Sequence, residues 1–431
     1  SIYNNSHIFS YKKIYYKNIA EMHRMSYLTI PNSIEIFMTN GKSYFICLNM
    51  TKREKIFMEI IARINDFYKT KETKIEGYSD SYLKKSSKNL ISENFYLKHC
   101  PITYLENNAK EYSGSSSGIF GLNLSIRKKS TNSSSNLLSN STIKITYSKA
   151  LVTANTFLSE VCDLWTKNKI SNYDYIMLLN ILSGRSLNNL SQYFIFPRLL
   201  NDFNHTILNW ISSAIYRDLS YPILSSEPSI RDDIKRKYDL NEEDKYHSGT
   251  FYSTYAFVAY FSIRQRPFTE ISLEIQGGQF DSTDRLFSGT KEICGMKEKY
   301  QESIPLLISL PELYVNTNKF NFGKAQNETT LVNDFGLPNW SKNDPRKFIL
   351  VMKKIFESKN VNLKLNKWID LIFGVAQSGP EAVKCLNTYR KACYELSFDE
   401  IEELKENGSL LSNLIEKQEL GYNAKQIFKK F

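Results

Sequence analysis

The side chains best suited to acid–base chemistry lie in two short stretches, KYHSGTFYSTY around His247 and LEIQGGQFDSTDRLF around Asp281 and Asp284. An imidazole beside a carboxylate can exchange protons near neutral pH, so an enzyme using His247 with one of these aspartates is one hypothesis. The alternative is structural: His247 bonds to backbone in a packed turn, while the aspartates cap a helix and pair with Arg285. We favour the structural alternative, because the sequence contains no G-x-S-x-G, kinase or dinucleotide motif.

The sequence contains no recognisable metal-binding or phosphate-binding motif. None of the five histidines lies in an H-E-x-x-H arrangement, and none of the six cysteines forms a C-x-x-C pair, so the cysteines resemble reduced thiols packed as small hydrophobic groups. The triplet from Gly41 to Ser43 is not a phosphate loop, because Ile36 stands where that motif needs glycine. We expect no catalytic residue, no metal ligand and no cofactor.

Arginine 185 poses a different question, because it stands in the apolar stretch LNILSGRSLNNLSQYFIFPRLL, directly behind Gly184. We interpret Arg185 as a structural charge whose donors bind carbonyls left open where a helix stops at Gly184. Other charges also lie within apolar sequence and should pair with one another or with backbone groups, since an unpaired buried charge costs several kcal/mol. The predicted structural charges of the core are Arg185, Asp218, Arg264, Asp284, Arg285 and Asp370.

Length and composition describe a globular chain of two or three units: 431 residues, 42% hydrophobic and 23% charged. No apolar run approaches the about 18 residues of a membrane span, and the start has no signal-peptide pattern. The chain opens on Ser1 rather than Met, which indicates an excised fragment. The net charge of +11 would suit an acidic partner, but the lysines are scattered and no RNA-binding signature appears, so we expect no nucleic acid.

The first segment, 8–67, predicts strands followed by one amphipathic helix. In SIEIFMTNGKSYFICL, two alternating runs flank Asn40-Gly41, a strong hairpin signal. Thr51 and Glu54 then predict a capping box at the start of the helix. Segment 68–146 is different: its polar, Ser- and Asn-rich sequence predicts a low-complexity linker, with a basic cluster at 127–129.

From about 147 the sequence predicts mostly helices. Helix starts are expected at Ser171, at Asp344 with Pro345 in the first turn, and at Ser397. The stretch GPEAVKCLNTYRKAC predicts one further helix with its apolar residues on one face. Between 185 and 340 short apolar runs are broken by Pro, Gly and Asn, which indicates a core partly built from irregular segments whose backbone needs side-chain partners.

From about 150 to 431 the sequence resembles the BEACH domain, through motifs that follow one another in that family's order. They include ISNYDYIMLLNILSGRSLNNLSQYFIFPRLL, RDLSYPI, YHSGTFYS, IRQRPFT, LEIQGGQFDSTDRLF, DFGLPNWSKNDPRKFI and WIDLIFGVAQSGPEAV. The motif positions are Asn180, Gln192, Pro197, Tyr252, Pro267, Phe268, Gln276, Gly277 and Trp368. The segment IFSYKKIYYKNIAEMHRMSYLTIPNSIEIFMTNGKSYFICLNMTKREKIFMEII is similar to the later strands and final helix of the PH-like domain that precedes BEACH.

The resemblance implies an α+β multidomain chain: a partial PH-like β-barrel with a C-terminal helix at 1–67, the linker at 68–146, and a mostly helical BEACH domain at 147–431. It also implies a cytoplasmic, non-enzymatic scaffold of vesicle traffic, peripheral to endomembranes and acting in endosome–lysosome or autophagy pathways. WD40 repeats are expected to follow in the full-length protein.

Protein partners are expected in a groove between the PH-like and BEACH units, with Glu35, Lys42 and Arg53 as candidate contacts. The alternative is a peripheral adaptor that binds anionic lipid through its basic surface, including the cluster at 127–129.

Overall fold

The computed structural model describes residues 13–28, 30–72, 158–201, 203, 209, 211–242, 244–280, 301–324, 331–423 and 425–429. The chain divides into two compact units, Ser1–Met25 with Pro31–Asp163 and Ser26–Ile30 with Leu164–Phe431. Apart from the end of a helix that runs to Glu72, the linker predicted at 68–146 lies outside the described residues.

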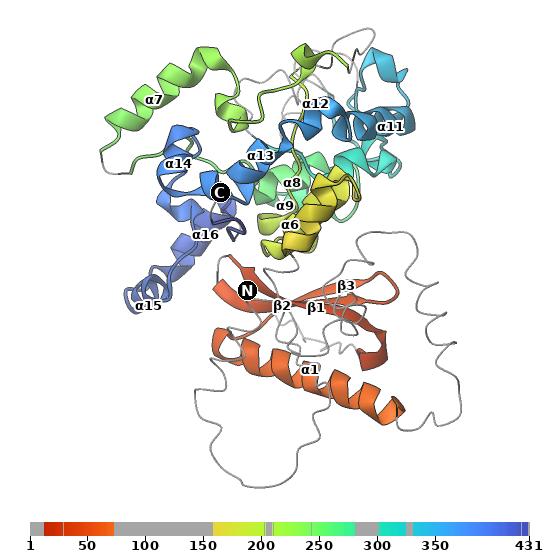
Figure 1. Ribbon diagram of the computed structural model, residues 1–431, viewed down its shortest axis with the longest axis vertical. Helices are drawn as coiled ribbons and strands as arrows, with labels where there is room; N and C mark the ends of the chain where they lie inside the picture. Colours follow the sequence, from red (N-terminus) through yellow and green to blue (C-terminus); the bar gives the residue numbers. More distant parts are fainter. Residues whose placement is uncertain are drawn as a thin grey trace. The chain divides into compact units, whose positions relative to one another are not determined.

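The first unit is a small sheet covered by one helix (Figure 1). Its elements are the 3-10 turn η1 (Tyr16–Asn18), strands β1 (Ile19–Tyr27), β2 (Ile30–Met38) and β3 (Ser43–Cys47), and helix α1 (Met50–Glu72). The strand order is β1-β2-β3. The helix lies along one face of the sheet, where Phe57 and Ile61, one turn apart, pack into a core with Met22, Ile34 and Ile36.

The predicted hairpin is confirmed. β2 and β3 pair antiparallel, with Ile34 opposite Ile46 and Ile36 opposite Tyr44. Gly41 takes the left-handed φ of +80° that such a tight connection requires.

The predicted capping box at the start of α1 is wrong in register. The helix begins at Met50, so Thr51 lies inside it, and the amides of Lys52 and Arg53 donate to Asn49 O instead. Glu54 does not fold back onto the helix end. It forms an ion pair with Arg24 on β1, at 2.5 Å between Oε1 and Nη2.

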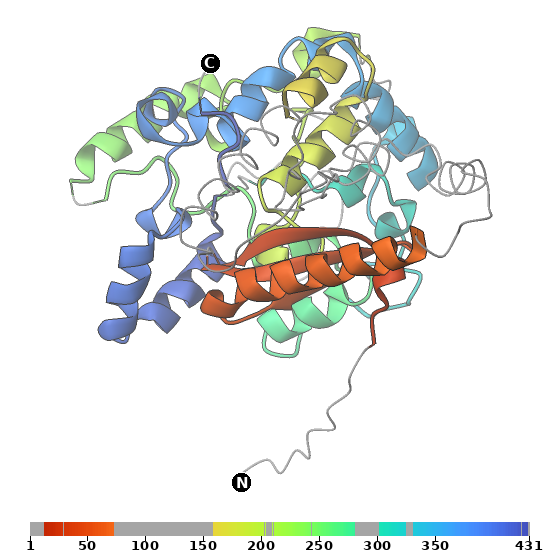
Figure 2. The same cartoon turned by 60° about the horizontal axis from the view of Figure 1, so that its bottom comes forward.

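The second unit is mostly helical, as predicted. The end of a helical stretch at 158–166 is followed by α6 (Asn172–Leu182). The remaining α-helices are α7 (Arg231–Leu240), α8 (Tyr255–Phe261), α9 (Phe268–Ile275), α11 (Pro345–Phe356), α12 (Lys359–Asn362), α13 (Leu365–Ile372), α14 (Gly379–Lys384), α15 (Phe398–Glu406) and α16 (Leu410–Leu420). Figure 2 shows these helices separated by long irregular stretches of chain.

The irregular middle of this unit is also as expected. Short 3-10 turns connect its segments: η2 (Leu190–Gln192), η3 (Ser213–Ile215), η4 (Ile223–Ser225), η5 (Pro228–Ile230), η7 (Pro305–Ile308), η8 (Pro311–Tyr314), η9 (Asn339–Ser341), η10 (Val375–Gln377) and η11 (Lys391–Cys393). Single β-bridges, such as Phe196 with Ser303, replace sheets there.

Three predicted helix starts are confirmed by their caps. The Ser171 side chain accepts from the Asp174 amide, and the Asp344 side chain accepts from the amides of Arg346 and Lys347. Ser397 makes a complete capping box with Glu400.

The helix predicted over GPEAVKCLNTYRKAC is too long. α14 ends at Lys384, because Leu386 takes a left-handed φ of +57°. Asn387 Nδ2, in the side chain, then donates to Leu371 O at 2.9 Å and to Ala376 O at 2.7 Å. The four side chains expected on its apolar face, Ala382, Leu386, Tyr389 and Cys393, are buried. A continuous helix is not what places them there.

Candidate functional site

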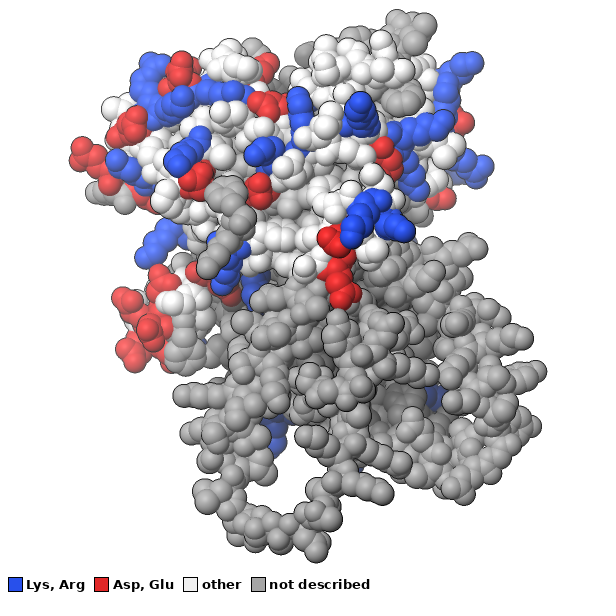
Figure 3. Space-filling view, in the orientation of Figure 1, with Lys and Arg blue, Asp and Glu red and all other residues white. Residues whose placement is uncertain are grey.

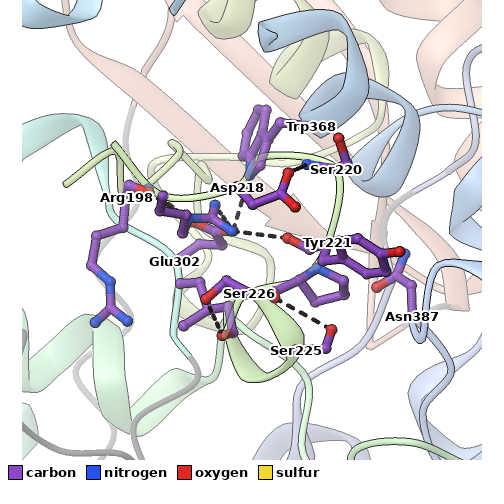
Figure 4. A network of polar contacts seen from close by, with 12 residues as sticks. Arg198, Asp218, Ser220, Tyr221, Ser225, Ser226, Glu302, Trp368 and Asn387 are labelled. Atoms are coloured by element: carbon purple, nitrogen blue, oxygen red, sulfur yellow. Dashed lines mark hydrogen bonds and ion pairs between the residues drawn. The ribbon is translucent and has the colours of Figure 1, made fainter. Parts of the chain in front are cut away.

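Arg217 and Glu302 are two buried charges of the second unit, each 2–3% exposed. Figure 4 shows Glu302 in its network of polar contacts, with Arg198 and Trp368 nearby. Arg217 Nη2 lies 2.6 Å from Glu302 Oε1. Its Nε donates to Arg198 O at 2.7 Å and its Nη1 to Tyr221 O at 3.0 Å. Glu302 also accepts from the Trp368 indole at 3.0 Å and from the Arg198 amide at 2.8 Å. All three nitrogens of the guanidinium therefore have partners.

Sequence reasoning missed this pair. It singled out Asp218 in YRDLSYP and passed over Arg217, the residue before it. The structure buries the arginine and leaves the aspartate partly exposed. The available signal was Arg217 itself, a second charge in the same apolar stretch, but nothing in the sequence connects it with a glutamate 85 positions away.

Two of the predicted core charges, Arg185 and Arg264, are 1% and 2% exposed. Arg185 Nη1 donates to Tyr193 O at 2.9 Å, and Arg264 Nε donates to Asn333 O at 2.9 Å. The expected partner of Arg185 was wrong in detail. The carbonyls at the end of α6 are taken by backbone amides, including the amide of Arg185 itself, which bonds Asn180 O.

Among the described residues, the predicted core acids Asp218 and Asp370 take other positions. Asp218 is paired with Arg231 at 3.2 Å, and its side chain is 40% exposed. Asp370 is half-buried, and burial raises the pKa of its carboxyl above the ordinary value. Asp284 and Arg285 lie outside the described residues, as does Asp281.

Two motif positions satisfy irregular backbone. The fully buried Asn180 donates to Ile176 O at 2.9 Å and Ile195 O at 3.0 Å, and accepts from the Ile195 amide at 2.8 Å. Gln192 donates to Tyr422 O at 3.1 Å and Asn423 O at 3.3 Å, which ties η2 to the chain after α16. Both amides therefore replace the hydrogen bonds that a regular element would supply.

The other motif positions serve packing or chain direction. Pro267 precedes α9, Phe268 opens it, Gln276 closes it, and Gly277 follows with a φ of +71°. Pro197, Tyr252 and Trp368 are buried in the core of the same unit.

His247 sits in a packed turn. Its amide donates to Thr388 O at 3.0 Å, its Nδ1 lies 2.7 Å from Thr388 Oγ1, and its ring stacks on Tyr238 with 4.3 Å between centroids. Burial lowers the pKa of His247 to about 4, so the ring is neutral at pH 7. These contacts match the structural alternative for this histidine.

The three candidate groove residues of the first unit differ in accessibility. Lys42 is exposed in the β2–β3 turn. Arg53 is half-buried on α1, and its Nη1 donates to Met25 O at 3.3 Å. Glu35, opposite Phe45 on β2, is only 2% exposed.

The second unit carries an open hollow of about 520 Å³. It is lined by Asn241, Asp244, Tyr246, Arg390, Lys391, Ala392, Leu396, Glu400, Glu403, Leu404, Asn413 and Glu416. Figure 3 shows acidic side chains gathered over α15, which forms one wall. A smaller cavity of about 50 Å³ is bordered by Glu302 and by aromatic side chains, including Phe203, Tyr314 and Phe348.

In the described ranges no three His, Cys, Asp or Glu side chains are grouped in a way that could hold a metal ion. Nor does any helix of those ranges combine the length and apolar character of a membrane span.

Comparison with known proteins agrees with the resemblance seen in the sequence. Residues 163–431 match the model of the Beige/BEACH domain. Beige protein homolog 1 of Schizosaccharomyces pombe is 35% identical over 277 residues, which is 62% of this chain and 11% of that protein. The putative neurobeachin homologs of Caenorhabditis briggsae and Caenorhabditis elegans are each 37% identical over 244 residues, 55% of this chain and 10% of theirs.

The chain thus spans about a tenth of the length of these relatives. The family model covers well over half of the chain, including every motif position named above. The irregular, side-chain-bonded core described here therefore belongs to a member of the Beige/BEACH family.

Proposed function

We propose that this protein is a non-enzymatic scaffold of vesicle and membrane traffic, working in the endosome–lysosome system or a related organelle pathway. The observation that carries the proposal is the 35–37% identity to a Beige protein homolog and to neurobeachin homologs across the BEACH region. The buried polar side chains of the second unit also support the scaffold proposal. Asn180, Gln192 and Arg217 hold backbone in place, which suits a rigid platform.

The proposed docking site is the groove that the family resemblance implies between the PH-like unit and the BEACH domain. Lys42 is the candidate whose side chain is exposed, and it therefore offers the cleanest test. A charge reversal there changes the surface without removing any contact of the core in the first unit.

The test is affinity purification from cells that make the protein naturally, with quantification of co-purifying proteins. Wild type is compared with Lys42→Glu and with Lys55→Glu, a matched reversal at an exposed position of α1. Melting curves first establish that both variants fold. We expect Lys42→Glu to lose specific partners that Lys55→Glu keeps. Identical partner sets for all three proteins would reject Lys42 as part of the docking site.

The second candidate is peripheral binding to anionic lipid, which the net charge of +11 favours. Each Lys or Arg near such a surface contributes about 1 kcal/mol, screened by salt. Vesicles with and without phosphatidylserine distinguish the two functions. Lipid binding is favoured if the protein sediments only with the anionic vesicles and salt reverses this. It is excluded if sedimentation does not depend on the charge of the vesicles.

A further inference from the structure

Arg185 is a fully buried guanidinium with unused donors. Among the described residues, its side chain is one of the largest with less than 2% exposure. Nη1 bonds Tyr193 O at 2.9 Å, but Nε and Nη2 have no hydrogen-bond partner. Burial lowers the pKa of Arg185 to about 10, which still leaves it charged at neutral pH.

The same unit shows how a buried arginine is normally accommodated. Arg217, equally buried, uses all three nitrogens and faces the Glu302 carboxylate at 2.6 Å. Within the described parts of the chain, no carboxylate lies within ion-pair distance of Arg185. Since an uncompensated buried charge costs several kcal/mol, Arg185 lacks what Arg217 has: a negative counter-charge.

Other unused polar atoms belong to the segments packed around Arg185. Tyr252 Oη is buried without a partner, and so are Nδ2 and Oδ1 of Asn423. The guanidinium carbon lies 5.6 Å from the Phe251 ring centroid, and that ring is 3.9 Å from the ring of Tyr252. Arg185 and Tyr252 are close enough for each to influence the pKa of the other.

The backbone holds these segments together. The Phe251 amide donates to Leu420 O at 2.8 Å. Gln192 bonds the carbonyls of Tyr422 and Asn423, and its own carbonyl accepts from the Ser186 amide at 2.9 Å. The loop after α6, the segment before α8 and the chain after α16 therefore meet around one positive charge.

We propose that Arg185, the Tyr252 hydroxyl and the Asn423 amide bind a small monovalent anion of the halide class inside the BEACH unit. A positive charge with two unused N–H donors, in a packed region that holds further unused polar groups, matches an anion better than water, since water supplies no counter-charge. A single charge balances a single guanidinium, and a small ion needs the least room beside a side chain that is 1% exposed.

The test is the melting temperature of the whole chain as sodium chloride or sodium bromide replaces sodium gluconate at constant ionic strength. A ligand that binds only the folded state raises the melting temperature with its concentration. We expect halide to raise it for wild type and for Arg390→Met, an exposed arginine control, and not for Arg185→Met. Tyr252→Phe keeps the charge but removes one donor, so about tenfold more halide should be needed.

Crystals grown in bromide supply an independent readout. We expect an anomalous bromide peak within hydrogen-bond distance of Arg185 Nε or Nη2. Should Arg185→Met fail to fold, the Tyr252→Phe titration and the bromide map still decide the question. The proposal is overturned if wild-type melting is indifferent to halide at constant ionic strength, or if the map shows only water beside Arg185.

Discussion

Arg217 and Glu302 form a buried ion pair, 2.6 Å between Nη2 and Oε1, although 85 positions separate them in the chain. Arg217 directly follows Tyr216, which forms a β-bridge with Leu200, and Glu302 lies just before η7. The Trp368 indole links the pair to α13. These segments share little regular structure, so few backbone hydrogen bonds connect them. The ion pair and its hydrogen bonds supply part of the connection that a sheet would make.

Removing the carboxylate should strongly destabilise the second unit. In Glu302→Gln, Arg217 keeps its charge and its burial but loses its counter-charge, so we expect the free energy of unfolding to fall by about 3–5 kcal/mol. Urea unfolding followed by tryptophan fluorescence measures the change. The matched control is Asp218→Asn, which breaks the partly exposed pair with Arg231 and should cost less than about 1 kcal/mol. Equal losses for the two variants would contradict the special role of the buried pair.

Asn180 should be nearly as sensitive as Glu302. Replacing it with alanine removes two donated hydrogen bonds and one accepted bond in a site without solvent, and leaves backbone groups of Ile195 unpaired. We expect a loss of about 2–4 kcal/mol. Asn321→Ala removes one exposed bond to the Gly323 amide and should change stability by less than about 1 kcal/mol. If thermal melts rank the two variants in the opposite order, Asn180 does not hold the irregular segment.

His247 should make folding sensitive to acid. Its folded pKa of about 4 lies below the ordinary value of 6.5, because burial disfavours the charged ring. Between pH 6.5 and pH 4 the unfolded chain therefore binds a proton that the folded chain does not, so this residue lowers stability as the pH falls through that window. Melting temperatures of wild type and His247→Gln across pH 7 to 4 isolate the effect. As the pH falls, the melting temperature of wild type should fall relative to that of His247→Gln. A difference in melting temperature that does not change with pH would refute the assignment.

Local signals in the sequence predicted the fold well wherever the cause was local. The caps at Ser171, Asp344 and Ser397 act within four residues, and the Asn40-Gly41 turn sets its own hairpin. The prediction at Thr51 was wrong because a capping pattern can also occur inside the first turn of a helix. Glu54 pairs there with Arg24 on a strand instead.

The charge network could be foreseen only in outline. Apolar context correctly marked Arg185 and Arg264 as buried, since that inference needs only the neighbouring residues. The carbonyls that they bond, and the Glu302 partner of Arg217, depend on segments brought together by folding. In the same way, the helix predicted beyond Lys384 failed because Asn387 bonds carbonyls of η10 and α13, which no helical period reveals.

Gly421, directly after α16, should tolerate no side chain. It takes a left-handed φ of +74°, and a Cβ there would lie 2.2 Å from Ser253 O and 3.1 Å from Phe251 Cβ. Neither obstacle is a flexible side-chain end, so Gly421→Ala must push the chain after α16 away from the segment before α8. We expect a loss above about 4 kcal/mol, together with faster hydrogen exchange at Asn423 and Lys425, whose amides bond Cys393 O and Ser183 O.

Comparing Gly408→Ala with Gly421→Ala distinguishes the cost of steric overlap from the cost of backbone strain. The φ of Gly408, +72°, is nearly the same, but nothing lies within 4 Å of an added Cβ. Gly408→Ala should therefore cost only the about 1–2 kcal/mol of a left-handed residue with a side chain, and should leave exchange after α16 unchanged. Equal melting temperatures for the two variants would mean that the contact with Ser253 is not maintained in solution. The larger loss at Gly421 would instead show that the end of α16 is fixed against the segment that carries Phe251 and Tyr252.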